Sequence, residues 1–369
     1  QTLLNVGVVD DLEFHEYSIA LPQELPCGYH SISVCEEQTV IADMRYILAP
    51  VACYQPEAIK AGKKLWGLSV QLYCLRSENN WGIGDFSDLA QLVTKAGKQG
   101  AGFIGLNPIH ALYPSNPEAC SPYGPSSRRW LNFLYIDVTA LPEYTSAAVQ
   151  AVVNAEDFQT RLQTARSVEY VDYSLVTELK MAALNSLFDE YYNAYLKKNT
   201  KQNREFKAFI QAGGESLEMQ ATYDAMQEYL QNEGKDAWGW PVFPENWRDF
   251  HNEAVAKFAK KHKKRVQFYM FLQWQAAEQL EKANQAAIAA GMPVGIYRDL
   301  AVGVSEGSAE IWGNKDLYCT AASVGAPPDI LGPLGQNWGL PPMDPEILYQ
   351  QAYQPIIDLF TSNMQSSGA

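Results

Sequence analysis

The feature that most restricts the fold is a strand–loop–helix–strand pattern in residues 65–109. A nearly continuous apolar run spans residues 65–75, as expected of a strand buried on both faces of a sheet. A helix follows, with its N-cap near Asp85 or Ser87 and Gly100 just beyond its end. A second apolar run covers residues 103–109. This succession predicts one βα unit of a parallel sheet.

A third strand is predicted at residues 293–300, after a long helix from about 266 to 290. A loop over residues 301–345 and a last helix from about 345 to 363 follow it. Three such units are three-eighths of a (β/α)8 barrel and too few to close one. The sequence therefore predicts an α/β fold, either a smaller α/β sheet or about three βα units that form the first part of a (β/α)8 TIM barrel.

Two domains are predicted. Residues 1–55 read as part of a small N-terminal β-sandwich, with strands at 16–21, 29–34 and 39–47. Residues 56–369 read as the N-terminal part of the barrel, with a mainly helical insertion at about 145–265 that a Trp-rich stretch interrupts. The chain starts at Gln1 and its earliest methionine is Met44, so we expect Gln1 not to be the native N-terminus.

Charge and composition exclude several classes of protein. The chain carries 28 basic and 42 acidic side chains, a net charge of −14, which argues against nucleic-acid and anionic-membrane partners. No apolar stretch is long enough to span a bilayer. The six cysteines and five histidines show no ligand spacing, so we expect free thiols, no metal site and a cytoplasmic location. The basic stretch 257–265 is interpreted as one solvated helix end.

Three loops, at residues 79–84, 121–123 and 327–342, are rich in aromatic, amide and glycine residues, a composition that suits sugar binding. We expect loops 121–130 and 325–342 to lie on one rim of the sheet. Asp299 is predicted at a strand end and Asp329 in a Pro-Pro-Asp loop, but spacing alone cannot pair carboxylates at the about 5–5.5 Å that retaining glycoside chemistry needs. His110 is expected to fix a loop rather than to act as an acid or base.

Several long, ordered motifs resemble those of bacterial amylomaltases, the 4-α-glucanotransferases of the α-amylase-like barrel clan. They are LWGLSVQLYCLRS (65–77), NWGIGDF (80–86), GLNPIH (105–110), SPY (121–123), YRDLAVGV (297–304) and GAPPDILGPLGQNWG (325–339). The resemblance covers about residues 20–369. Within the family, the sequence resembles the enterobacterial branch, which carries an N-terminal β extension.

The resemblance implies a retaining transfer of α-1,4-glucan segments between maltooligosaccharides, without a metal or organic cofactor. In that family the SPY motif lines the donor subsites, which corresponds to Ser121 and Tyr123. The Pro-Pro-Asp and Gly-Gln-x-Trp-Gly loop covers the cleft and favours sugar over water, which corresponds to Asp329, Gln336 and Trp338. Asp299 matches a family aspartate near the cleft.

One departure from the family pattern matters. The family nucleophile lies in an Arg-x-Asp-His motif, the acid/base in Glu-Asp-Leu-Gly and a third aspartate in a His-Asp pair, and none of these strings occurs here. No catalytic residue is assigned, and we expect an internal fragment that is inactive alone and pairs with itself or with a missing C-terminal half. Two alternatives remain: a non-catalytic α-glucan-binding or folding fragment, and a complete small α/β enzyme that uses Asp299.

Overall fold

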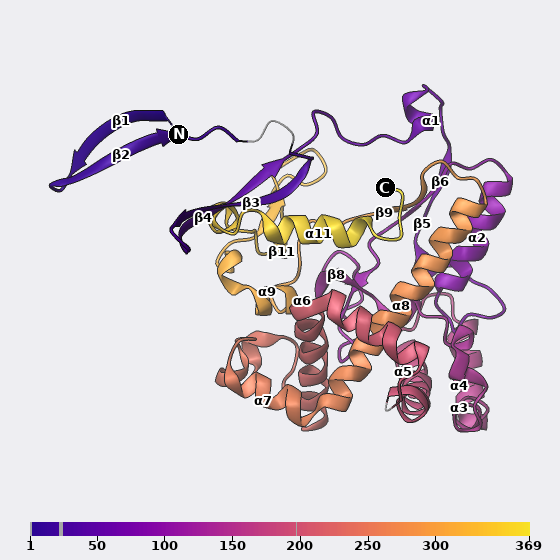
Figure 1. Cartoon of the computed structure of the whole chain (residues 1–369). Helices are drawn as coiled ribbons and strands as arrows, with labels where there is room; N and C mark the ends of the chain where they lie inside the picture. Colours follow the sequence, from indigo (N-terminus) through magenta and orange to yellow (C-terminus); the bar gives the residue numbers. More distant parts are fainter. Residues whose placement is uncertain (1, 22–24, 197) are drawn as a thin grey trace. The chain divides into compact units, whose positions relative to one another are not determined.

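The computed structural model describes residues 2–21, 25–196 and 198–369, and the chain divides into two compact units, residues 1–55 and 56–369 (Figure 1). The first unit contains two antiparallel hairpins, β1 (Thr2–Val9) with β2 (Leu12–Ser18) and β3 (Gly28–Glu36) with β4 (Thr39–Leu48). Asp10 and Asp11 join β1 to β2 with φ angles of 51° and 63°, the left-handed conformation that a tight hairpin turn requires.

The strands predicted at residues 29–34 and 39–47 are confirmed by β3 and β4. The strand predicted at 16–21 is shifted: β2 ends at Ser18, and its partner β1 was not predicted. The hairpins form two separate two-stranded sheets. The packing of a sandwich therefore stays a prediction.

The second unit is built on a three-stranded parallel sheet. Its strands are β5 (Gly67–Val70), β6 (Phe103–Leu106) and β9 (Gly295–Arg298), in that order across the sheet. Ser69, Gly105 and Tyr297 stand in one row of the register, and their neighbours in each strand point to the other face. All three strands therefore bring their carboxyl ends to the same edge.

Two helices that pack against each other accompany the sheet, α2 (Phe86–Lys98) and α8 (Lys263–Ala289) (Figure 1). The predicted start of α2 is confirmed: Asp85 is the N-cap and accepts a hydrogen bond from the Asp88 N–H at 2.9 Å, while the Asp88 carboxylate accepts one from the Asp85 N–H. Gly100 follows the helix with φ 87°, a conformation that favours glycine. A short helix, α1 (Glu57–Lys60), precedes the sheet.

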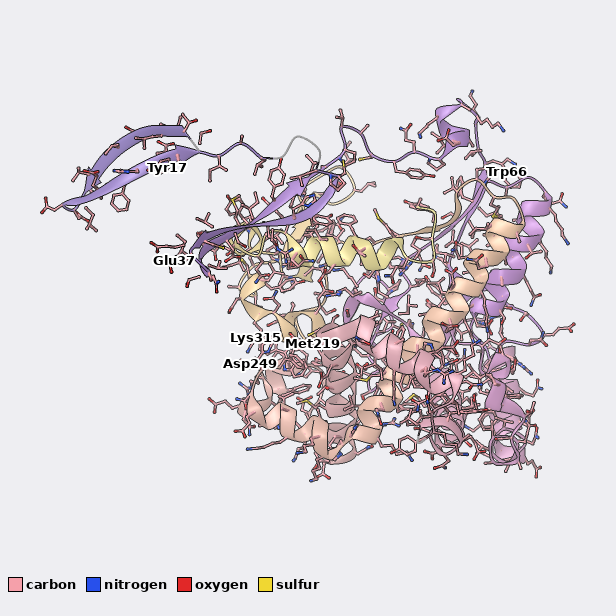
Figure 2. All side chains as sticks on the ribbon, in the orientation of Figure 1. Tyr17, Glu37, Trp66, Met219, Asp249 and Lys315 are labelled. Carbon is pink, nitrogen blue, oxygen red and sulfur yellow. The ribbon has the colours of Figure 1, made fainter. Side chains whose placement is uncertain are left out.

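The prediction that residues 65–75 form a strand buried on both faces is wrong. Only Gly67–Val70 are extended, and a 3₁₀ turn at Leu72–Cys74 follows. Trp66, which Figure 2 labels just before β5, is 49% exposed, and Leu68 is 41% exposed. Among the described residues no strand pairs with the outer edge of β5, and apolarity alone does not tell an edge strand from a central one.

The insertion is helical, as predicted. Its helices are α3 (Ala147–Val153), α4 (Glu156–Ser167), α5 (Tyr173–Tyr191), the short π-helical turn Tyr192–Leu196, α6 (Lys201–Asn232) and α7 (Glu253–Lys261). The Trp-rich stretch forms two 3₁₀ turns, Trp240–Val242 and Glu245–Trp247. The lysines of the basic stretch 257–265 are exposed, as predicted, but the stretch is not one helix end. It crosses from α7 to α8, and the part-buried Arg265 forms an ion pair with Glu228.

The two long loops after β6 and β9 contain structure of their own. After β6 come β7 (His110–Ala111) and β8 (Ser127–Leu131), an antiparallel pair, and the 3₁₀ turns Phe133–Tyr135, Val138–Ala140 and Pro142–Thr145. After β9 come α9 (Ala309–Gly313), the 3₁₀ turn Lys315–Leu317 and the hairpin of β10 (Val324–Ala326) with β11 (Gln336–Leu340).

The last helix is interrupted rather than continuous. It consists of α10 (Pro345–Gln350) and α11 (Gln354–Met364), because Ala352 and Tyr353 adopt positive φ angles of 50° and 58° between them. Among the described residues, no helix is both long enough and apolar enough to cross a lipid bilayer.

Candidate functional site

A pocket of about 450 Å³ lies where the three parallel strands end. It is lined by Ser69, Val70, Gln71, Gly105, Leu106, Asn107, Tyr123, Tyr297 and Asp299. These residues come from the carboxyl ends of β5, β6 and β9 and from the loop after β7. In α/β folds with parallel strands this edge is where ligands bind, so the pocket is the candidate functional site.

The floor of the pocket follows from the strand register. Gly105 on β6 stands between Ser69 and Tyr297, and a Cβ atom at Gly105 would lie 3.1 Å from the Tyr297 ring. The glycine therefore leaves room for the ring to lie close against β6. Tyr297 remains 47% exposed, so part of its side chain is available to a ligand.

Asp299 supplies the carboxylate of the pocket. Its backbone N–H donates to the Leu106 carbonyl at 3.1 Å, which continues the pairing of β9 with β6 by one residue. Burial raises the pKa of its carboxyl above the ordinary value, and the Leu300 N–H opposes that shift. Asp299 is the one carboxylate among the residues that line this pocket.

Tyr123 enters the pocket from a turn that Ser121 shapes. The Ser121 hydroxyl accepts a hydrogen bond from the Tyr123 N–H at 3.4 Å, and the Ser121 carbonyl accepts one from the Gly124 N–H at 3.2 Å. The Tyr123 side chain is 54% exposed. Ser121 thus holds the turn, whereas Tyr123 presents its ring.

A buried set of contacts, which we call the Arg128 network, ties this loop to the loop after β9. The Arg128 guanidinium donates to Glu310 at 2.7 Å (Nη2 to Oε1) and at 3.2 Å (Nε to Oε1), and to the Val302 carbonyl at 3.0 Å. The Tyr318 hydroxyl donates to Glu310 at 2.6 Å. The ion-paired side chains are only 6% and 14% exposed. Burial by itself would raise the pKa of Glu310, but Arg128 holds it below the ordinary value.

Further contacts between the same two loops surround this network. The Ser305 hydroxyl donates to the Gly124 carbonyl at 3.0 Å, and the Glu310 N–H donates to the Ser126 carbonyl at 3.1 Å. The Ala301 N–H donates to Nε2 of His110 at 3.3 Å. Burial, followed by the charge of Arg298, lowers the pKa of His110 to about 3, so His110 is a neutral acceptor that fixes a loop, as predicted. Together these contacts set the positions of Tyr123 and Asp299.

The other three predicted residues lie in the β10–β11 hairpin and do not line the pocket. Oδ1 of Asp329 accepts from the Leu331 N–H at 2.9 Å, and Gln336 Oε1 accepts from the Trp338 indole N–H at 2.9 Å. The base of this hairpin is close to the loop after β9, because a Cβ atom at Gly303 would lie 3.1 Å from Leu340. The structure thus places Tyr123 and Asp299 in one pocket, and Asp329, Gln336 and Trp338 are not part of its lining.

Seven residues of the pocket lining were not predicted, and four of them have polar side chains: Ser69, Gln71, Asn107 and Tyr297. All four lie at or next to a strand end, and strand alternation places Ser69 in the same row as Tyr297. The sequence contained the signal that could have found them. The carboxyl ends of parallel strands lie at one edge of a sheet, and strand alternation determines which residues share a face.

A larger cavity of about 730 Å³ lies elsewhere, between α6, α9, α11 and β8. Its lining includes Ser216 and Met219 of α6 and Gln354 of α11, and Met219, marked in Figure 2, lies beside Gly313. None of the six predicted site residues lines it. Within the described ranges no group of three or more His, Cys, Asp or Glu side chains could hold a metal ion.

Comparison with known proteins identifies the family of both units. Residues 70–369 match the family profile of 4-alpha-glucanotransferase, glycosyl hydrolase family 77, and residues 2–50 match the MalQ N-terminal beta sandwich domain. The 4-alpha-glucanotransferase of Haemophilus influenzae is 41% identical over 354 residues, which cover 95% of this chain and 50% of that protein. The Mycobacterium tuberculosis 4-alpha-glucanotransferase is 35% identical over 362 residues, covering 96% and 48%.

Solved structures agree with this. The crystal structure of amylomaltase from Corynebacterium glutamicum matches with a TM-score of 0.79 and 26% identity, over 99% of this chain and 49% of that one. Amylomaltase from Streptococcus agalactiae, in complex with acarbose, matches with a TM-score of 0.66 and 19% identity over 83% and 58%, which is a likeness of fold. The chain spans about half the length of the curated relatives it matches. On the strength of the profile match, the chain belongs to the 4-alpha-glucanotransferase family, glycosyl hydrolase family 77.

Proposed function

We propose that this chain holds α-1,4-glucans in the strand-end pocket, as the glucan-binding part of a 4-α-glucanotransferase that moves segments between maltooligosaccharides by a retaining double displacement. The observation that carries the proposal is the meeting of Tyr123 and Asp299, which are 176 positions apart in the sequence, in one pocket at the strand ends. Family membership and the transferase names of the relatives support it.

The pocket has the groups that a glucose unit needs. A pyranose ring has an apolar C–H face, which packs on an aromatic ring, and Tyr123 and Tyr297 each leave about half of the side chain exposed. Its hydroxyl groups need hydrogen-bond acceptors, and the Asp299 carboxylate is one. Ser121 contributes by holding the turn that carries Tyr123.

We propose further that the sheet is the first part of a (β/α)8 barrel. The last residues of the chain pair with β9. The Gly368 N–H donates to the Ile296 carbonyl at 2.9 Å, and the Arg298 N–H donates to the Ala369 carbonyl at 2.8 Å. This backbone pairing supports a sheet that continues beyond β9. Within the described part of the chain no strand pairs with the outer edge of β5, and a strand of a second copy or of a C-terminal half would fit there.

The β10–β11 hairpin would cover the cleft and place Asp329, Gln336 and Trp338 against the glucan. Three apolar side chains at its tip support this role, because they are almost fully exposed and available to pack on another surface: Ile330, Leu331 and Leu334. An apolar cover excludes water from the site, and a sugar hydroxyl then becomes the preferred acceptor.

The bond-breaking step needs a second carboxyl group. Retaining glycoside chemistry uses a nucleophilic carboxylate and an acid/base carboxyl about 5–5.5 Å apart. The pocket lining carries Asp299 alone, so residues 1–369 would bind glucan without cleaving it. A non-catalytic glucan-binding or folding fragment is the alternative that the same feature favours.

Incubation of the purified chain with maltotriose tests this proposal. We expect saturable binding of maltoheptaose by calorimetry, and neither glucose nor longer maltodextrins by chromatography. Tyr123→Ala should weaken binding by about tenfold, the loss of one stacked ring and its buried area. The matched control is Tyr170→Ala, since Tyr170 is 80% exposed and lies outside the pocket. Transfer products from this chain alone would refute the missing-carboxyl argument, and absence of binding would refute the glucan site.

A further inference from the structure

The carboxamide of Asn107 has no hydrogen-bond partner. Its Nδ2 and Oδ1 atoms are both buried, and neither finds a donor or acceptor among the described residues. Buried polar side-chain atoms are bonded in the large majority of cases, because an unmade bond leaves the cost of removing the group from water uncompensated. An amide that lacks all of its partners therefore calls for an explanation.

The backbone fixes where this amide stands. Asn107 is the first residue after β6, and its N–H donates to the Val70 carbonyl at 3.4 Å, at the end of β5. Pro108 follows it, and a residue before proline is restricted to extended conformations. The pairing with β5 and the following proline therefore both favour an extended backbone at Asn107, in line with β6.

The surroundings of the amide point to a ligand. Asn107 lines the same 450 Å³ pocket as Tyr297 and Asp299. A carboxamide presents one donor and one acceptor side by side, which matches two neighbouring hydroxyl groups of a sugar, each of which can donate and accept. Its terminal torsion is broad, and no hydrogen bond holds it, so the amide can turn toward a ligand without breaking a hydrogen bond.

We propose that the Asn107 carboxamide binds a pair of adjacent hydroxyl groups on one glucosyl unit, whose apolar face packs on the Tyr297 ring. Tyr297 is set close to β6 by Gly105, so the ring and the amide belong to neighbouring strands and face one pocket. This inference rests on the proposed glucan-binding function and adds to it two residues that orient the sugar. It assigns them a binding role and no part in bond cleavage.

Replacement of Asn107 by leucine separates a binding role from a structural one. Leucine has a similar shape and no polar atoms, so it removes an unpaired buried amide, and the urea midpoint of the chain should stay the same or rise. Maltoheptaose binding should weaken by about tenfold, as expected for the loss of two hydrogen bonds. Asn107→Ala serves as a second variant, and Asn232→Leu, at the exposed end of α6, is the matched control.

The outcomes are distinct. Weaker binding by both Asn107 variants with an unchanged or higher urea midpoint for the leucine variant supports the inference. Wild-type affinity in the Asn107→Leu variant overturns it and leaves the glucan site intact. A lower urea midpoint in both variants means that the amide stabilises the fold, which also overturns it. If the wild-type chain binds no maltoheptaose while Asn232→Leu behaves in the same way, the proposed function itself fails, and this inference fails with it.

Discussion

Replacing Arg128 by methionine is expected to lower the free energy of unfolding by about 3–5 kcal/mol, because the change leaves the Glu310 carboxylate buried without its partner. Glu310 would keep only the Tyr318 hydroxyl and the backbone N–H of residue 128 as hydrogen-bond donors. The carbonyls of Ala301 and Val302 would lose their donor as well. Urea denaturation followed by tryptophan fluorescence measures the change.

The double variant Arg128→Met/Glu310→Met is the matched control. An apolar pair in place of a buried ion pair is often neutral or stabilising, so we expect the double variant to be more stable than the single one. It should still bind maltoheptaose less tightly than the wild type, because the loops that carry Tyr123 and Asp299 lose the hydrogen bonds of the Arg128 network that hold them in position. If Arg128→Met unfolds at the same urea concentration as the wild type, the network does not hold these loops.

The free energy of unfolding is expected to fall by on the order of 4 kcal/mol between pH 4 and pH 7 because of one side chain, Asp224 in α6. Burial raises the pKa of its carboxyl to about 8, although the Gln220 amide, which donates to both oxygens at 3.0 and 3.2 Å, opposes the shift. The charge of Glu228 adds to the increase. The folded chain therefore keeps a proton that the unfolded chain loses near pH 4.

The sign follows from this difference in proton binding. A carboxyl whose folded pKa is raised contributes its full stability below its unfolded pKa, and that contribution is lost as the pH rises toward 8. Asp224→Asn should therefore flatten the stability profile between pH 4 and pH 8 and stabilise the chain at pH 7. Asp236→Asn, at an exposed position, is the control and should leave the profile unchanged. An equal slope in wild type and Asp224→Asn would show that Asp224 is not the group responsible.

Local signals in the sequence predicted the parts of the fold that depend on neighbours along the chain. Asp85 predicted the start of α2, because a capping box needs only four consecutive residues. The long apolar stripe predicted α8, and the short apolar runs predicted β6 and β9. These elements are fixed by periodicity and by caps, which are properties of short segments.

Features that depend on distant contacts were not predictable in this way. Residues 65–75 look like a central strand, but β5 lies at the edge of the sheet that the described residues form, and Trp66 and Leu68 are exposed. The interruption before α11 depends on the left-handed φ angle of Tyr353, a residue type that rarely adopts it. Arg128 and Glu310 are separated by 182 positions, and no local pattern links them.

Some residues of the candidate site were likewise predictable from local motifs, and others depend on distant contacts. Tyr123 and Asp299 were found through motifs, and they share the pocket. Asn107 and Tyr297 line it because three strands end together, and Gly105 creates the space for one of them. Asp329, Gln336 and Trp338 lie on a hairpin whose tip projects apolar side chains, so their contact with glucan stays a prediction.

Hydrogen–deuterium exchange of the chain, with and without maltoheptaose, tests the central claim most directly. If the glucan binds where β5, β6 and β9 end, exchange should slow in the peptides that contain residues 69–71, 105–107, 121–124 and 297–299. The account would be contradicted if exchange slowed only in the peptides that line the larger cavity between α6 and α11. Saturable binding with no protection at the three strand ends would also contradict it.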